Sequence, residues 1–106
     1  DGFQALNDII PTSDKVKYIN QLLRCGFQTV EVGSFVSPKL IPQMADTAEV
    51  LRQLDMRDVT SDLAVLAVTE KGGQMACDFK QVDQIFFPFS TSPTFLRRNI
   101  KSTFIF

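Results

Sequence analysis

Polar side chains follow each of the apolar runs in this sequence, and their types suit the binding and turnover of a small ligand. Asp1 and Gln4 open the chain, and Glu31 and Ser34 come at the end of the apolar run 27–32. Carboxylates can move protons, and hydroxyl and amide groups can orient a substrate. Later apolar runs are followed by a second and a third polar group, Thr69 with Glu70 and then Ser90, Thr91 and Ser92.

Glu31 is the least expected of these residues at its position, because the rest of its run is typical of a buried strand. A carboxylate inside such a strand costs free energy unless it pairs with a cation or contacts a metal ion. From the residues alone, two interpretations stay open. Either Glu31 faces a ligand or metal, or it lies at an exposed edge or pairs with a lysine.

The elements that position these residues alternate between helix and strand. Apolar residues at helical spacing after Pro11, with Gly26 as a left-handed cap, predict a first helix, and Asp46 with Glu49 resembles the capping box of a second. Lys71 and the residues after it predict a short third helix. The expected helices cover residues 12–25, 46–54 and 71–78, and the expected strands cover residues 27–32, 63–68 and 82–89.

This alternation predicts an α/β protein with parallel strands. Two architectures fit it, an open doubly wound sheet and a (β/α)₈ barrel, and neither G-x-G-x-x-G nor a P-loop motif is present to favour the first. In both architectures ligands bind at the carboxyl ends of the strands. The polar residues after each run are therefore expected to gather at one rim of the sheet.

Composition excludes several other classes of function. The chain has 106 residues, 44% of them hydrophobic and 22% charged, which is typical of one globular domain or part of a larger one. A formal charge of -1 gives no basic surface for nucleic acid, and no apolar stretch is long enough to span a membrane. Cys25 and Cys77 lack zinc or redox spacing and are expected as small buried residues. The chain begins at Asp1 rather than Met, so a segment that precedes Asp1, such as a removed targeting peptide, is not excluded.

Several short stretches, taken in order, resemble the 3-hydroxy-3-methylglutaryl-CoA lyases. They are D-G-F-Q at residues 1–4, I-P-T at 10–12, V-E-V-G-S-F-V-S-P-K at 30–39 and P-Q-M-A-D at 42–46. The stretch S-F-V-S-P-K followed by P-Q-M is far more specific than a match of fold alone, and it separates these lyases from the related condensing enzymes. The resemblance implies that residues 1–106 are the incomplete N-terminal part of a pyruvate-carboxyltransferase-like TIM-barrel domain.

The resemblance also implies roles for individual residues. Asp1 matches a ligand of a catalytic divalent cation, Mg²⁺ or Mn²⁺, and Gln4 matches a polar residue near metal and substrate. Glu31 matches an acidic residue that helps to organise the metal site and a catalytic arginine. Ser34 and Phe35 match the start of a loop that walls the substrate pocket, where apolar residues would shield the reacting centre. The implied reaction is cleavage of an acyl-CoA substrate, 3-hydroxy-3-methylglutaryl-CoA, to acetoacetate and acetyl-CoA.

Other features of these lyases are missing from the sequence. The catalytic arginine would precede Asp1, and the family's His-x-His pair and catalytic cysteine have no counterparts in a chain that contains no histidine. A complete barrel takes about 250 residues, so we expect a fragment that is inactive alone. We expect the full-length parent to be a homo-oligomer of the cytoplasm, or of the mitochondrial matrix in a eukaryote, with no nucleic-acid or membrane partner. The alternatives are a non-catalytic α/β domain that binds a ligand or partner, and a Claisen-type condensing enzyme.

Overall fold

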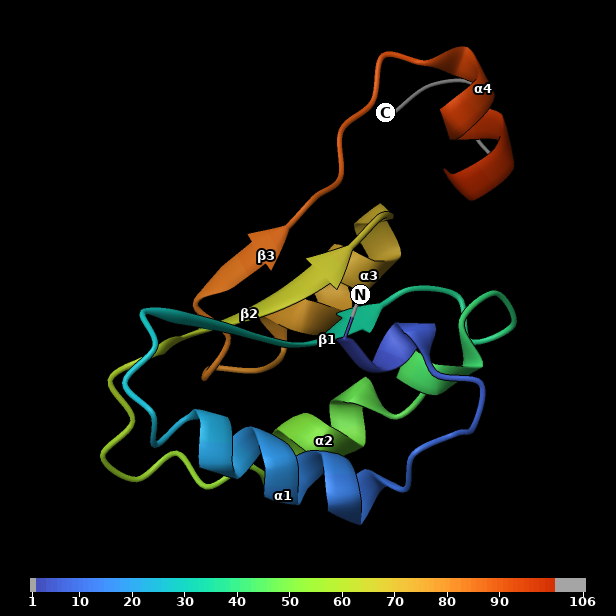
Figure 1. The fold of residues 1–106 in the computed structure, drawn as a ribbon. Helices are drawn as coiled ribbons and strands as arrows, with labels where there is room; N and C mark the ends of the chain where they lie inside the picture. The colour runs from blue at the N-terminus through green and yellow to red at the C-terminus, as the bar shows by residue number, and fades with distance from the viewer. Residues whose placement is uncertain (1, 101–106) are drawn as a thin grey trace.

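The computed structural model describes residues 2–100, in which helices alternate with strands (Figure 1). The strands are β1 (Thr29–Phe35), β2 (Asp62–Ala67) and β3 (Gln84–Phe86). The α-helices are α1 (Thr12–Leu22), α2 (Thr47–Gln53), α3 (Glu70–Cys77) and α4 (Pro93–Phe95). Short 3₁₀ turns, η1 (Gly2–Ala5) and η2 (Pro42–Met44), and a π-helical segment, η3 (Leu96–Ile100), complete the described part.

Within residues 2–100 the strands form a three-stranded parallel sheet in the order β1-β2-β3. Helices α1, α2 and α3 cover one face of it, since Ile19 of α1, Val50 of α2 and Ala76 of α3 share a core with Leu63 and Val65 of β2. Figure 1 shows α1 and α2 lying next to one another along that face. A doubly wound sheet carries helices on both faces, whereas a barrel carries them only outside. The fold is therefore part of a (β/α)₈ barrel.

The two faces of the sheet differ in what they carry. Leu63 and Val65 point into the core beneath the helices and are fully buried. The opposite face, which would line the inside of a barrel, carries Glu31 and Ser34 of β1, and Ser34 lies beside Leu66 of β2. Helices α1, α2 and α3 pack on the other face, whereas the turn η1 lies against this one, and Gln4 of η1 lines a cavity there with Glu31 and Ser34.

A β-bulge between Glu31 and Gly33 sets the orientation of the site residues. The strand continues to Phe35, so the prediction that it ends near Glu31 is wrong, and Glu31 lies inside β1. In a regular strand Glu31 and Ser34 would point to opposite faces, because side chains alternate. The extra residue on β1 changes this alternation, so that Glu31 and Ser34 share the open face.

Gly33 allows α2 to approach β1 closely. A Cβ atom at Gly33 would lie 2.7 Å from both Cγ2 and Oγ1 of Thr47, the first residue of α2. Thr47 is buried, and its Oγ1 lies 2.9 Å from the carbonyl oxygen of Ser34 and accepts a hydrogen bond from the Ser34 N–H at 3.2 Å. The contact therefore joins α2 to the backbone of the residue after Gly33.

The helix ends confirm one prediction and correct another. Gly26 has φ of +79°, the left-handed conformation that was predicted for it. However, α1 ends at Leu22 and is capped by Leu23, so Gly26 ends the turn that follows the helix rather than the helix itself. Asp46 precedes α2 but makes no capping hydrogen bond, and Glu49 instead accepts a hydrogen bond from Gln53. The predicted capping box is therefore absent, because the Asp46 carboxylate is engaged by Lys15 of α1.

Two expectations from composition can also be compared with the structure. Cys25 and Cys77 are free and exposed, so the expectation that they are buried is wrong. Cys25 follows the last turn of α1, and Cys77 ends α3. Within the described residues, no helix has both the length and the apolar character that crossing a membrane requires.

Strand β3 is much shorter than the predicted strand 82–89. Its pairing with β2 ends at Phe86, opposite Leu66, shortly before β2 itself ends. Pro88 then offers no N–H for a ladder. Ile85 and Phe86 are 40% and 39% exposed, and no strand pairs with the outer edge of β3 in the described part of the chain.

Replacing Gly33 with alanine tests the contact with α2. Gly33→Ala is expected to lower the free energy of unfolding by about 1–3 kcal/mol, because the new methyl group forces Thr47 away from β1. Gly73→Ala is the matched control: Gly73 lies in α3 with nothing within 4 Å of the added Cβ, and the change should stabilise by up to about 1 kcal/mol. Urea unfolding measures both, and equal stability of Gly33→Ala and the parent would contradict the contact.

The open edge of β3 predicts that the 106-residue chain by itself self-associates. We expect oligomers at about 10 µM and above, because apolar side chains and unpaired backbone groups lie together at this edge. Ile85→Lys should lower the mass-average molecular weight in sedimentation experiments. Leu40→Lys, which changes an apolar residue that is 53% exposed in the loop after β1, should not. A chain that stays monomeric, or an equal effect of both variants, would contradict the prediction.

Candidate functional site

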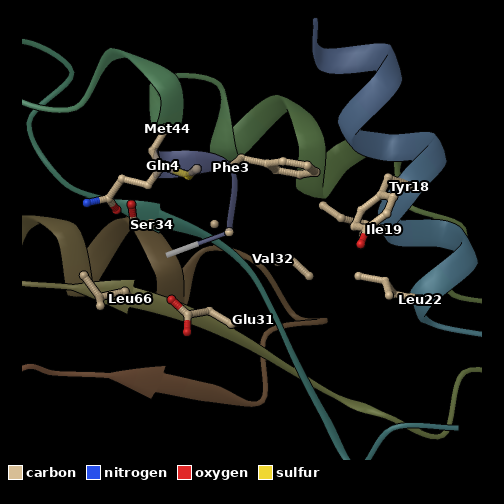
Figure 2. Close-up of a pocket in the computed structure, with 12 residues that line it drawn as sticks. Phe3, Gln4, Tyr18, Ile19, Leu22, Glu31, Val32, Ser34, Met44 and Leu66 are labelled. Carbon is tan, nitrogen blue, oxygen red and sulfur yellow. The ribbon is translucent and has the colours of Figure 1, made fainter. Parts of the chain in front are cut away.

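Three of the predicted site residues come together on the open face of β1. Gln4, Glu31 and Ser34 line one cavity of about 820 Å³ (Figure 2). Gln4 comes from the turn η1, and Glu31 and Ser34 come from the bulged strand. Leu66 of β2 closes the polar end of the cavity beside them. The prediction that the polar groups gather at one place therefore holds for these three residues only. Thr69 instead caps α3 and lines a separate cavity, and Ser92 caps α4. The roles of Gln4, Glu31 and Ser34 stay predictions.

The rest of this cavity is apolar and runs along the edge of β1 toward α1. Phe3 packs edge-to-face against Tyr18 of α1, with ring centroids 5.4 Å apart. Ile19 and Leu22 of α1 continue this wall, and all four residues are seen together in Figure 2. The cavity can therefore receive a molecule with a polar and an apolar part.

Glu31 is exposed, and it forms no ion pair within residues 2–100. Of the two interpretations that the sequence left open, the structure places Glu31 on an edge strand, and its side chain also faces the shared cavity. A hydrated carboxylate in this position can accept hydrogen bonds from a ligand or from a cationic side chain.

Ser34 is the buried polar group of the cavity. Its side chain is enclosed, with 6% of the residue exposed, and its Oγ has no hydrogen-bond partner within the described residues. Buried hydroxyls normally have a partner, because leaving one unpaired costs about 1–3 kcal/mol. An oxygen atom of a ligand, or a group outside residues 2–100, would satisfy this hydroxyl.

Phe35 does not join the other predicted substrate-binding residues. Its ring lies in the core and stacks on Phe79, with centroids 5.9 Å apart. It lines a separate cavity of about 450 Å³ with residues of the following loop and of α3. Leu40 of the same loop is 53% exposed in the described part of the chain, and shielding of a reacting centre by this loop stays a prediction.

The described residues do not make a metal site by themselves. No cluster of three or more histidine, cysteine, aspartate or glutamate residues that could hold a metal ion occurs in residues 2–100. Glu31 is the one carboxylate of this cavity within that range. Asp1, the predicted ligand of Mg²⁺ or Mn²⁺, lies outside the described residues.

Sequence reasoning missed a polar cluster next to the site, formed by Lys15, Gln43, Asp46 and Thr47. Lys15 and Gln43 are almost fully buried. Burial disfavours the charged form of Asp46, but hydrogen bonds from Lys15 and Thr12 and the charge of Lys15 outweigh it and lower the pKa of Asp46. The sequence holds one signal for this cluster, since Lys15 lies four residues before Ile19 on the apolar face of α1.

Comparison with known proteins connects the chain to one group of enzymes. A curated relative from Arabidopsis thaliana, a mitochondrial hydroxymethylglutaryl-CoA lyase, is 39% identical over 103 residues, which make up 97% of this chain and 22% of the relative. The HMG-CoA lyase structure from Brucella melitensis has a TM-score of 0.88 at 37% identity and covers 96% of this chain and 35% of that one. The structure of an HMG-CoA lyase from Acinetobacter baumannii in complex with coenzyme A and 3-methylmalate has a TM-score of 0.89 at 32% identity. The match covers 96% of this chain and 33% of that one.

The match is extensive along this chain but partial along its relatives. No family model matches the sequence. A cytoplasmic 3-hydroxy-3-methylglutaryl-CoA lyase from Mus musculus is 52% identical over 52 residues, so both mitochondrial and cytoplasmic forms are among the relatives. The chain spans between 22% and 33% of the length of the curated relatives that it matches almost throughout. By sequence and by fold, the chain is therefore similar to one segment of the hydroxymethylglutaryl-CoA lyases.

Proposed function

We propose that the whole protein containing this chain cleaves 3-hydroxy-3-methylglutaryl-CoA to acetoacetate and acetyl-CoA. One observation carries the proposal: Gln4, Glu31 and Ser34 converge on the open face of a partial barrel whose homologues are hydroxymethylglutaryl-CoA lyases. In barrel enzymes the site lies at the carboxyl ends of the strands, where Ser34 and the turn η1 also lie. The chain supplies one wall of that site.

The residues on this wall suit the binding of an oxygen-rich substrate. The Ser34 hydroxyl would donate its unused hydrogen bond to a substrate oxygen, and the Gln4 amide would contact the same end of the molecule. Glu31 would accept a hydrogen bond from the substrate or hold a catalytic arginine supplied from outside residues 2–100. Phe35, which faces the second cavity, would support the wall from behind.

Cleavage of a tertiary alcohol needs a base for the hydroxyl proton and a group that stabilises the enolate. This chain contains no histidine, and its described residues lack a complete set of such groups around the cavity. The remaining catalytic groups would come from the rest of the whole protein. The isolated chain is therefore expected to bind substrate weakly and to show no turnover.

The proposal includes a divalent metal ion because Asp1 is a predicted metal ligand; no other residue of this chain is proposed to bind the ion. The described residues do not form a metal site, so Mg²⁺ or Mn²⁺ would need Asp1 together with ligands from the rest of the whole protein. We further propose an acyl-CoA partner, a homo-oligomeric parent, no nucleic-acid or membrane partner, and a cytoplasmic location, or the mitochondrial matrix in a eukaryote. The names of the relatives support either compartment.

Substitutions in the full-length protein test the roles of the two β1 residues. Glu31→Gln is expected to lower kcat/KM for 3-hydroxy-3-methylglutaryl-CoA by about 10²–10³-fold, because a positioned charge is lost. Ser34→Ala is expected to raise KM about tenfold, because a hydrogen bond to the substrate is lost. Coupled detection of acetyl-CoA measures both.

Glu49→Gln is the matched control for this experiment. Glu49 lies on α2, is exposed and contacts Arg52 and Gln53 rather than the cavity, so its replacement should leave turnover unchanged. A full-length protein that folds but does not cleave the thioester with Mg²⁺ or Mn²⁺ present would overturn the proposed function. Turnover of the thioester by the isolated chain would contradict the proposal that the remaining catalytic groups come from the rest of the whole protein.

A further inference from the structure

Lys15 is a charged residue in the buried layer between α1 and α2. It is 3% exposed, and its Nζ lies 2.7 Å from Oδ1 of Asp46. The ammonium group also donates to the carbonyl oxygen of Gln43. Thr12, at the start of α1, donates to the other oxygen of Asp46 at 2.6 Å. The start of α1 is thus tied to η2 and to the start of α2 by polar contacts.

Gln43 extends this cluster to the N-terminal segment. Its side chain accepts a hydrogen bond from the Ile10 N–H at 2.9 Å and donates one to the Asp8 carbonyl oxygen at 2.8 Å. The turn η1, which carries Gln4, precedes this segment and buries none of its own residues. Within the described residues η1 lies next to η2, Phe3 contacts Tyr18, and Gln43 holds the segment that follows η1.

The cluster also contacts Ser34, through Thr47. Thr47 directly follows Asp46, and its Oγ1 contacts both backbone polar groups of Ser34 and lies 2.9 Å from the carbonyl oxygen of Met44. Met44 itself follows Gln43 and lines the same cavity as Gln4 and Ser34 (Figure 2). One buried cluster therefore reaches both polar residues from different directions.

We infer that Lys15 and Gln43 are positioning residues that hold Gln4 and Ser34 at a fixed separation across the cavity. Neither residue lines the cavity, so both act through the segments that they join. The role of the cavity in substrate binding rests on the proposed function, whereas the ordering of residues 2–10 by Gln43 does not. The cluster thus links α1, the η1 segment and α2 at the rim of the barrel.

The opposite end of α1 provides a matched comparison. Arg24 donates to the carbonyl oxygens of Arg57 and Asp55, at 2.7 and 3.0 Å, and pairs with the Asp55 carboxylate. Asn20 accepts a hydrogen bond from the Asp55 N–H. These contacts also tie α1 to the chain around α2, but they lie beyond the end of α2 and have no link to η1 or Ser34.

Hydrogen exchange of the full-length protein tests the inference with Gln43→Met, Lys15→Met and the control Arg24→Met. In Gln43→Met the Ile10 amide is expected to exchange about tenfold faster or more, because its acceptor is gone. Arg24→Met should leave exchange in residues 2–10 within about twofold of the parent. Lys15→Met is expected to speed exchange at both residues 2–10 and Ser34. Thermal unfolding of each variant separates these local changes from a general loss of stability.

Kinetics provide the second readout. Gln43→Met should raise KM for the thioester about tenfold with a smaller change in kcat, because substrate contacts are misplaced while the reacting groups remain. Arg24→Met should change neither constant at equal stability. Unchanged exchange in residues 2–10 of Gln43→Met, or the same increase in Arg24→Met, would overturn the inference. If the parent lacks lyase activity, the proposed function fails while the exchange result still decides whether the cluster orders η1.

Discussion

The close contact between α2 and β1 at Gly33 is the constraint on which the site depends. No Cβ atom fits between Gly33 and Thr47, so the helix can place a hydroxyl directly against the Ser34 backbone. The bulge beside Gly33 turns Ser34 to the same face as Glu31. Without the bulge the carboxylate and the hydroxyl would point to opposite sides of the sheet. Backbone geometry within β1 therefore produces the polar end of the cavity.

The general architecture could be predicted from the sequence, because it rests on strong periodic signals. The apolar run 63–68 and the helical spacing after Pro11 lead to a parallel strand and a helix, and both are found. The choice between barrel and doubly wound sheet could not be made locally, since it depends on which face the helices cover. The site residues Gln4, Glu31 and Ser34 were singled out by their types and positions along the chain, and the resemblance to the lyases then implied their roles. Their convergence follows from the fold.

Other features were beyond prediction for physical reasons. A bulge is a property of a strand pair, so Gly33, a glycine inside a strand, indicates a bulge or a close backbone approach but does not fix the shift between Glu31 and Gly33. Phe35 was assigned to a pocket wall, but the bulge turns it into the core against Phe79. Lys15 was not identified from the sequence, because its partner Asp46 lies 31 residues away along the chain. Long-range polar contacts of this kind appear only once the elements are packed.

In the proposed function the described segment is one wall of the active site, and its central feature is the Ser34 hydroxyl, which has no hydrogen-bond partner within residues 2–100 and lies on the same face as Glu31. The most direct test is a crystal structure of the full-length protein with a non-cleavable analogue of 3-hydroxy-3-methylglutaryl-CoA. We predict an oxygen of the acyl group within about 3.2 Å of Ser34 Oγ, with Gln4 and Glu31 around the same end of the ligand. An analogue bound in an intact barrel with its acyl group away from β1, and Ser34 still without a ligand contact, would contradict the account.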